Sequence, residues 1–502
     1  MTVSDSPIKR LLVQTSHYSF ASVLTMIAGL VSFPILTRVF SVSDYGVMNL
    51  VSATLSVGVT IGKFGLQHSI IRYDSEIRSG KSRFTIGQLY STTLIGMAVA
   101  ALAVIGVLLA GTQLSPPSWL SEVRVRRLFA IAALLILVQS IESALINFLR
   151  AEQETVTLMK YQVVKKYLGL AMILTAVLII ARSLAAFYTA SVLAEALSVF
   201  ALSRIVFGRG RRPAPRVSQF SRPLYTELIS YGIPMMIGYE LSGIVLSVGD
   251  RYVIEAMIGS TTLGLYAAAY NLCQYVQAVF IESVSQAIMP IYMRLYHQQG
   301  VKETEAFIAR SLRTYVLFGA PVIAGLAAVG PELLPSLASD KYASASVILP
   351  WVIAGMVIDG TNSMLGAGLF INKKTRIITS IVISAAVLNI VLNLIMVPRI
   401  GIVGAAIATV ASYGATSLAM GIAGRRLLRI SLPVATLLRA GGAAVVMYLA
   451  LRNLFPGHRL LSAGVRIVTG APIYVVLIAI VDGDARAIIR KGIARLRSRA
   501  TS

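Results

Sequence analysis

The sequence is poor in charged residues, and this scarcity excludes most soluble folds. Only 13% of the 502 residues are charged, against about 25% in soluble proteins. Hydrophobic residues make up 56% of the chain, and the mean hydropathy is +0.77. A soluble fold cannot bury this much apolar surface, so the composition excludes soluble, disordered and collagen-like chains.

Cysteine and the motifs of soluble enzymes are also scarce. A single cysteine, Cys273, excludes an intramolecular disulfide, and the four histidines show no metal-ligand spacing. The stretch Gly80-Lys81-Ser82 resembles the end of a phosphate-binding loop, but Ser75 stands where that motif requires glycine. We therefore expect no enzymatic activity, no cofactor and no metal site.

The sequence is rich in long apolar runs, each long enough to cross a bilayer. A hydrocarbon core of about 30 Å requires roughly 20 apolar residues per helix. This length predicts an all-α integral membrane protein with about fourteen transmembrane helices. The predicted spans are 16–39, 45–68, 86–111, 128–149, 161–181, 184–207, 226–248, 263–290, 311–331, 345–371, 375–397, 402–424, 433–451 and 460–481.

The basic residues predict the orientation of these spans. An even number of spans places both termini on one side. With that side taken as the cytoplasm, its loops hold about three times as many Lys and Arg residues as the outer loops, as the positive-inside rule requires. The net charge of +24 thus reflects loop charge at a membrane, and we expect no nucleic-acid partner.

A basic linker divides the chain into two pseudo-symmetric halves. The expected organisation is an N-terminal lobe of six spans, a cytoplasmic linker, a C-terminal lobe of six spans, two further spans and a basic cytoplasmic tail, at 1–210, 211–225, 226–429, 430–483 and 484–502. Two matched spacings support the repeat, since Arg38 follows Tyr18 and Arg251 follows Tyr231 by the same interval. A glycine, Gly46 or Gly264, then opens the next span in each half.

Charged residues at membrane depth are the candidate functional residues, because each costs about 2.5–3.5 kcal/mol at the bilayer centre unless it faces a cavity or a partner. Lys63, at membrane depth, and Arg38 and Arg251, at outer helix ends, are candidates for binding an anionic group. The candidate cavity or coupling acids are Glu240, Asp250, Asp359, Glu142, Glu195 and Glu282. Glu240 is our first candidate for binding a proton.

Each candidate also has a purely structural interpretation. Lys63 can reach the aqueous interface along its aliphatic stem, and Arg38 and Arg251 can contact lipid headgroups. Asp250 can form a local ion pair with Arg251. The remaining acids can make polar contacts between helices.

Three stretches resemble oligosaccharide flippases of the polysaccharide-synthesis family, the Wzx-like branch of the multidrug/oligosaccharidyl-lipid/polysaccharide exporters. They are Phe33-Pro34-Ile35-Leu36-Thr37-Arg38 with Asp44-Tyr45-Gly46, Gly249-Asp250-Arg251-Tyr252-Val253-Ile254 with Leu263-Gly264-Leu265-Tyr266-Ala267, and Pro398-Arg399-Ile400-Gly401-Ile402-Val403-Gly404-Ala405-Ala406-Ile407-Ala408. The resemblance extends along essentially the whole chain.

This resemblance implies alternating access by two six-helix lobes in the bacterial cytoplasmic (inner) membrane. The implied substrate is an undecaprenyl-diphosphate-linked oligosaccharide used for O-antigen, exopolysaccharide or capsule. Arg38 and Arg251 match positions expected to contact the diphosphate, and the last two helices are expected to form a groove for the lipid tail. Membrane lipids, a polymerase and chain-length-control proteins are the implied partners, and a monomer suffices.

Three other functions remain open from the sequence. A flippase for the peptidoglycan precursor shares the diphosphate, although only Arg38 and Lys63 lie in the first two spans. A cation-coupled multidrug exporter is compatible with the intramembrane acids. An integral-membrane glycosyltransferase or polymerase is disfavoured because no large outer loop exists.

Overall fold

The computed structural model describes residues 24–114, 123–208, 210, 212–452, 459–483 and 486. Regular structure within these residues is helical, with no strand, which confirms the predicted all-α class. Residues 16–23 of the first predicted span lie outside the described part. The predicted tail at 484–502 also lies outside it, apart from Arg486.

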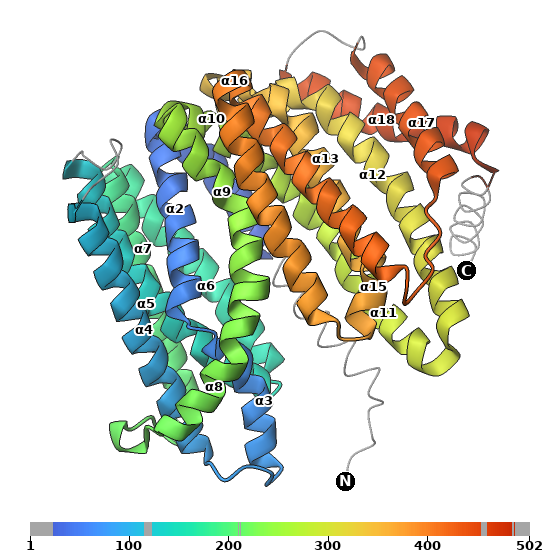
Figure 1. Cartoon of the computed structure of the whole chain (residues 1–502). Coiled ribbons are helices and arrows are strands. Elements are labelled where there is room, and N and C mark those ends of the chain that lie inside the picture. Colours follow the sequence, from blue (N-terminus) through green and yellow to red (C-terminus); the bar gives the residue numbers. More distant parts are fainter. Residues whose placement is uncertain are drawn as a thin grey trace, which may run out of the picture. The chain divides into compact units, whose positions relative to one another are not determined.

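The chain forms two compact units, Met1–Gly264 and Leu265–Ser502. Figure 1 shows the order of the helices in each. Unit 1 contains a helix at Leu24–Val39, then α2 Val42–Gly62, α3 Leu66–Arg78, α4 Ile86–Leu114, α5 Val123–Ala151, α6 Thr155–Thr175, η2 Ala176–Ile180, α7 Leu184–Phe207, η3 Val217–Gln219, α8 Arg222–Met235, η4 Met236–Leu241 and α9 Ser242–Met257. The helix α10, Ser260–Gln277, begins at the end of unit 1 and continues into unit 2.

Unit 2 includes the two longest helices of the described part, α12 and α16 (Figure 1). It contains η5 Ala278–Glu282, α11 Ser283–Gln299, α12 Val301–Leu337, η6 Asp340–Ile348, α13 Leu349–Asp359, α14 Asn362–Leu365, α15 Ala367–Ile371, α16 Thr375–Gly424, α17 Val434–Arg452 and α18 Arg459–Val481. The predicted domain division at 211–225 stays a prediction.

Ten helices of the described part are long and apolar enough to cross a membrane, or eleven if the bent pair Arg222–Gly238 and Ser242–Met257 forms one span. The 50-residue α16 bends at Ile400 and Gly401, between the two spans predicted at 375–397 and 402–424. At 1.5 Å per residue its length is about 75 Å, more than twice the hydrocarbon core. The count of fourteen spans stays a prediction.

Each unit has an apolar interior and an apolar outer surface. In unit 1 a buried cluster that includes Leu66, Tyr90 and Phe148 joins α3, α4 and α5. Large side chains such as Val107 and Phe200 are exposed instead, at 75% and 63%. Exposed apolar side chains are unfavourable in water but favourable against lipid. The helices therefore present apolar faces both to the interior of the unit and to the surrounding lipid.

The matched glycines of the predicted repeat lie where α2 and α10 approach each other closely. A Cβ atom added to Gly46 would collide with the backbone of Ser260 and Gly264, and one added to Gly264 would collide with Val42. Small residues are required where two helix backbones come this close. The glycine in each half therefore has a packing role.

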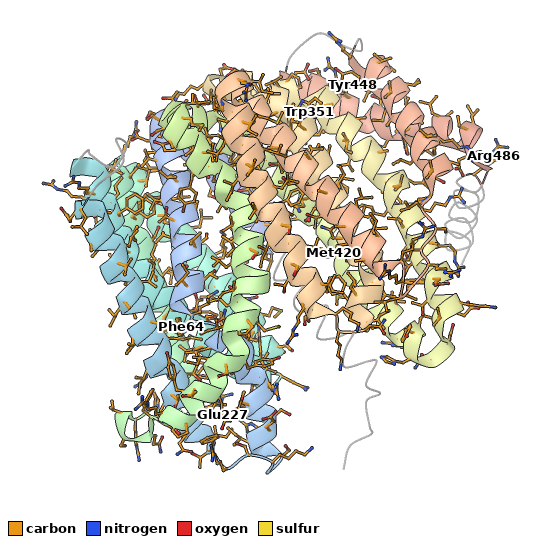
Figure 2. All side chains as sticks on the ribbon, viewed as in Figure 1. Phe64, Glu227, Trp351, Met420, Tyr448 and Arg486 are labelled. Carbon is orange, nitrogen blue, oxygen red and sulfur yellow. The ribbon has the colours of Figure 1, made fainter. Side chains whose placement is uncertain are left out.

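Unit 1 contains a second close approach, where the chain breaks between α2 and α3. Phe64, labelled in Figure 2, and Gly65 have positive φ angles of 52° and 76°. A Cβ atom on Gly65 would meet the backbone of Gly232 in α8, and one on Gly232 would meet Gly65. The break therefore depends on two glycines, one of which needs the left-handed backbone conformation.

Substitution of these glycines tests this packing. Gly80 has a similar φ of 71° with no atom near its Cβ position. Gly80→Ala should therefore lower the free energy of unfolding through conformational strain alone, by about 1–2 kcal/mol. Gly65→Ala should cost about 1–3 kcal/mol more, because its Cβ would overlap backbone. Thermal unfolding of the two purified variants gives the comparison. Equal losses would show that α8 does not constrain Gly65.

Candidate functional site

The carboxylate of Glu240 receives donors from four side chains of unit 1. Lys63 Nζ lies 3.0 Å from Glu240 Oε1, and Thr60 Oγ1 donates to the same oxygen at 3.5 Å. Gln67 Nε2 donates to Oε2 at 2.5 Å, and His68 Nε2 lies 3.1 Å from it. We call Thr60, Lys63, Gln67, His68 and Glu240 the carboxylate cluster.

Both chain segments of the carboxylate cluster are interrupted helices. Lys63 follows the end of α2, and Gln67 and His68 occupy the first turn of α3. Glu240 lies in the π-helical turn η4, which follows the Pro234-containing end of α8. Irregular backbone at membrane depth is tolerated where it lines protein or water, and π-turns concentrate at functional sites.

The cluster is partly open to solvent. The side chains of Lys63, His68 and Glu240 are 18%, 23% and 22% exposed. An unpaired charge at this depth would be strongly unfavourable, so Lys63 and Glu240 satisfy each other. Because each remains accessible, an anion entering from water can compete with Glu240 for the same donors.

A second ion-pair cluster joins three other helices of unit 1. Lys165 Nζ on α6 lies 2.6 Å from Glu142 Oε2 on α5 and 2.7 Å from Glu195 Oε2 on α7. Tyr161 donates its hydroxyl to Glu142 at 2.7 Å. We call Glu142, Tyr161, Lys165 and Glu195 the lysine cluster.

The other predicted residues lie apart from these clusters. Arg38 is exposed and donates to the Pro34 carbonyl at 3.1 Å. The whole of α2 separates it from Lys63, about 30 Å at the helical rise. Asp250 and Arg251 are buried within α9, at 2% and 7% exposure. Arg38 and Lys63 therefore lie at different depths of unit 1.

Two predicted acids belong to unit 2. Asp359 accepts a hydrogen bond from Asn362 at 2.8 Å, where α13 gives way to α14. The side chain of Glu282 lies outside the described part of the structure. Roles for both in coupling stay predictions.

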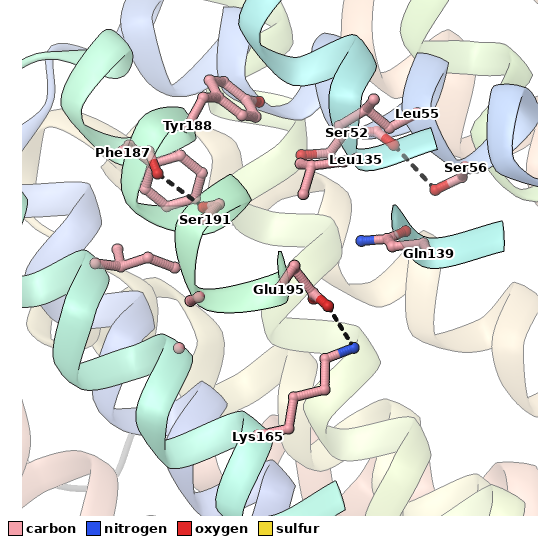
Figure 3. A pocket seen from close by; sticks show the side chains of 13 residues that line it. Ser52, Leu55, Ser56, Leu135, Gln139, Lys165, Phe187, Tyr188, Ser191 and Glu195 are labelled. Carbon is pink, nitrogen blue, oxygen red and sulfur yellow. Dashed lines mark hydrogen bonds and ion pairs between the residues drawn. The ribbon is translucent and has the colours of Figure 1, made fainter. Parts of the chain in front are cut away.

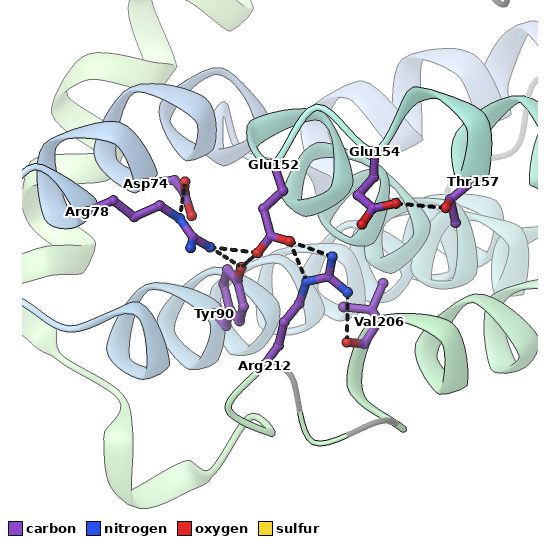
Figure 4. Close-up of polar contacts among 8 residues, drawn as sticks. All are labelled: Asp74, Arg78, Tyr90, Glu152, Glu154, Thr157, Val206 and Arg212. Carbon is purple, nitrogen blue, oxygen red and sulfur yellow. Dashed lines mark hydrogen bonds and ion pairs between the residues drawn. The ribbon is translucent and has the colours of Figure 1, made fainter. Parts of the chain in front are cut away.

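Charged residues also tie the linker to the loop between α5 and α6 (Figure 4). Arg212 Nη2 lies 2.5 Å from Glu152 Oε2, and Arg78 Nη2 lies 2.6 Å from Oε1. Burial alone would raise the pKa of the Glu152 carboxyl. The hydrogen bond and charge of Arg212, with the charge of Arg78, outweigh burial and hold that pKa below its usual value.

In unit 2, two ion pairs connect α12 with α18 and with the residue that follows α18. Arg466 lies 2.8 Å from Glu332, and the fully buried Asp482 lies 2.8 Å from Arg313. A groove with mostly apolar walls and a volume of about 1040 Å³ lies alongside these ion pairs, and we call it the apolar groove. Its walls include Phe318 and Val322 of α12, Leu451 of α17, and Ile467 and Gly470 of α18.

Sequence reasoning missed several polar residues of these clusters. Lys165 lies inside the predicted span 161–181, so its depth was a usable signal for a partner of Glu142 or Glu195. Gln67 and His68 fall at the end of the span 45–68, where polar residues are ordinary. Nothing in the sequence joins them to Glu240, which is 173 residues from Gln67.

The fold is similar to that of known membrane transporters. The structure of "Lipid II flippase MurJ, inward closed conformation" matches with a TM-score of 0.75 and 14% identity, covering 95% of this chain and 100% of that chain. An inward-facing multidrug resistance MATE family transporter of the MOP superfamily matches with a TM-score of 0.60 and 15% identity, covering 82% and 94%. At these identities the likeness shows the fold alone.

The sequence assigns the family. The profile of the polysaccharide biosynthesis protein family matches residues 11–296, more than half of the chain, so the protein belongs to that family. An uncharacterized membrane protein of Methanocaldococcus jannaschii is 28% identical over 39% of this chain and 38% of its own length. The probable low-salt glycan biosynthesis flippase Agl15 of Haloferax volcanii is 22% identical over 36% and 39%. The chain thus spans less than two fifths of each of these relatives.

The Glu152 contacts predict a pH dependence of stability. Because its pKa is depressed from 4.5, Glu152 should stabilise the fold fully above that pH, and the contribution should be lost as the pH falls through the folded-state pKa. Glu152→Gln should therefore lower the Tm at neutral pH, and the difference from wild type should close in acid. Thermal unfolding over a pH series measures it.

Glu154 provides the matched control for this prediction. Its carboxylate accepts a hydrogen bond from Thr157 at 2.9 Å (Figure 4). Glu154→Gln should change the Tm less at neutral pH. A Glu152→Gln deficit that persists unchanged in acid would contradict the assigned role of the carboxylate charge.

Proposed function

We propose that this protein flips a polyprenyl-diphosphate-linked oligosaccharide across the cytoplasmic membrane for surface polysaccharide synthesis. The observation that supports this most directly is the carboxylate cluster, in which donors from the interrupted α2–α3 segment surround the Glu240 carboxylate of η4. Family membership in polysaccharide biosynthesis agrees with it.

The cluster has the chemistry that a lipid-linked diphosphate requires. Such a headgroup cannot cross hydrocarbon without its charge being neutralised. An ammonium, an amide and an imidazole can all donate to phosphate oxygens, and charge-assisted bonds of this kind are short and strong. We infer that Glu240 occupies the position of the phosphate when no substrate is bound and returns to Lys63 after release.

The apolar groove in unit 2 supports the lipid part of the proposal. Its walls include residues from α17 and α18, the helices expected to hold the lipid tail. A chain of isoprene units is stabilised against such a surface as it is in the bilayer interior. The oligosaccharide would meanwhile follow a hydrated path.

Arg38 and Arg251 would bind the diphosphate at other stages of its passage. Their guanidinium groups can bind phosphate in a bidentate manner. Because α2 places Arg38 about 30 Å from Lys63, we assign Arg38 to a different stage of translocation from Lys63. Arg251 likewise would bind the diphosphate after it leaves the cluster.

The remaining parts of the proposal concern the cellular setting. We place the protein in the bacterial inner membrane with both termini in the cytoplasm, working by alternating access as a monomer. O-antigen, exopolysaccharide or capsule would be the polymer, and a polymerase and chain-length-control proteins would use the product.

The peptidoglycan-precursor flippase is the second candidate, favoured by the fold match with MurJ. Proteoliposomes that contain the purified chain separate the candidates. The probes are a polyprenyl-diphosphate-linked oligosaccharide, lipid II and a cationic drug, each scored for the fraction that reaches the opposite leaflet or compartment. We expect transport of the first probe. Transport of lipid II alone or of the drug alone would contradict the proposal.

A lysine substitution tests the role of the carboxylate cluster. Lys63→Met should reduce flipping about 10–100-fold, because a hydrogen bond to a charged group contributes about 1.5–3 kcal/mol. The assay measures initial flipping rates in proteoliposomes with equal amounts of protein.

Lys81→Met is the control for Lys63→Met, since Lys81 is exposed in the loop before α4. It should flip at a rate near wild type. If Lys63→Met also retains the wild-type rate, the diphosphate binds elsewhere.

A further inference from the structure

A partly open pocket of unit 1 lies beside the lysine cluster. It has a volume of about 300 Å³ and is walled by α2, α5, α6 and α7. Figure 3 shows Lys165 and Glu195 facing this space, together with Ser52, Ser56, Gln139 and Ser191. We call it the lysine cavity. Its volume is sufficient for several water molecules, which the polar walls can bind.

The hydroxyl groups of the lysine cavity are arranged as acceptors. Ser52, Ser56 and Ser191 each donate to a backbone carbonyl of their own helix, those of Met48, Ser52 and Phe187, at 2.7 to 2.9 Å. Each hydroxyl proton is therefore engaged in a hydrogen bond, and the oxygen lone pairs remain able to accept one. These oxygens can accept hydrogen bonds from water in the cavity, and Lys165 and the Gln139 amide can donate to it.

Two carboxylates share one closely bound ammonium group beside the cavity. Glu142 and Glu195 carry two negative charges when ionised, and Lys165 lies between them and contacts both. Tyr161 donates to Glu142, and Lys166, whose side chain is exposed, attracts Glu195 electrostatically. The wall residues contributed by α2 carry no charge. The two carboxylates therefore compete for Lys165, and protonation of one of them relieves that competition at membrane depth.

The two carboxylates differ in how well they are stabilised. Glu142 is 8% exposed, accepts the Tyr161 hydroxyl, and binds Lys165 through both oxygens, at 2.7 and 2.6 Å. Glu195 borders the cavity and has a single close ion-pair contact, 2.7 Å from Lys165. The ionised form of Glu142 is thus better stabilised, so an added proton should bind to Glu195.

We propose that Glu195 binds and releases one proton from the lysine cavity and that this step is coupled to substrate transport. The proposal rests on the transport function proposed above. The proton adds to a carboxylate oxygen of Glu195 to give a neutral carboxylic acid, and Lys165 stays paired with Glu142. Release to the cavity water reverses the step.

A proton fits this site better than a sodium ion does. The Lys165 ammonium already occupies the position between the two carboxylates where a metal cation would bind. A sodium ion would have to displace it, whereas a proton on Glu195 requires no displacement. Glu240 is less suited to the role, because its carboxylate receives four donors.

Protonation would change which helices are held together. With Glu195 neutral, Lys165 keeps its ion pair with Glu142, so α6 stays attached to α5. The attraction between α6 and α7 weakens, because an ion pair is replaced by a hydrogen bond. The two helices meet at a short connection, where Ser183 caps α7 at 3.2 Å after the π-turn η2. A small shift of α7 is thereby coupled to the proton.

Infrared spectroscopy tests the proton site without any substrate. Acidification of the purified full-length protein should produce the carbonyl stretch of a buried carboxylic acid. That band should be absent in Glu195→Gln and retained in Glu303→Gln, a matched change at an exposed glutamate of α12. In Lys165→Gln the band should appear at a higher pH, because the compensating ammonium is gone. A band that is the same in Glu195→Gln as in wild type would overturn the proposal.

Transport measurements test the coupling. At constant sodium, the wild-type flipping rate should depend on the pH gradient, and Glu195→Gln should lose that dependence while Glu303→Gln keeps it. Replacing sodium by choline at fixed pH should have no effect. A rate that follows sodium and ignores pH would overturn the proposal. Absence of flipping in the wild type would instead refute the transport function and leave the infrared result standing.

Discussion

A charge inside a bilayer must be paired or hydrated, and this constraint accounts for the polar architecture of unit 1. Lys63 and Glu240 come from segments 177 residues apart in the chain, yet they form a 3.0 Å contact. Lys165 meets two glutamates from two other helices in the same way. Each contact fixes the relative position of helices whose apolar faces alone would pack with less specificity.

The constraint also explains why interrupted helices accompany the carboxylate cluster. Side chains on regular helices present one residue per turn to a neighbour. The break at Phe64 and Gly65 lets Lys63, Gln67 and His68 approach one carboxylate. The π-turn η4 places Glu240 between them. The local backbone irregularity thus gathers several donors at a single anion position, which is the property that binding a phosphate requires.

The sequence predicted the helices far better than the contacts between them. Helix positions follow from apolar run length, and the bend at Ile400 and Gly401 falls between the spans predicted at 375–397 and 402–424. Lys63, Glu142, Glu195 and Glu240 were identified because charge at membrane depth is costly. Their partners were not, because pairing depends on three-dimensional proximity. Lys165 lies four residues inside its predicted span, so its depth indicated a need for a partner but could not identify Glu142 and Glu195 as that partner.

We propose that the substrate diphosphate takes the place of Glu240 at the donors of the carboxylate cluster. The most direct test is the distance between Lys63 Nζ and Glu240 in a structure of the protein bound to a polyprenyl-diphosphate-linked oligosaccharide. We expect the phosphate to lie within hydrogen-bonding distance of Lys63, Gln67 and His68, and the 3.0 Å contact between Lys63 and Glu240 to be lost. A bound diphosphate elsewhere, with the contact between Lys63 and Glu240 intact, would contradict it.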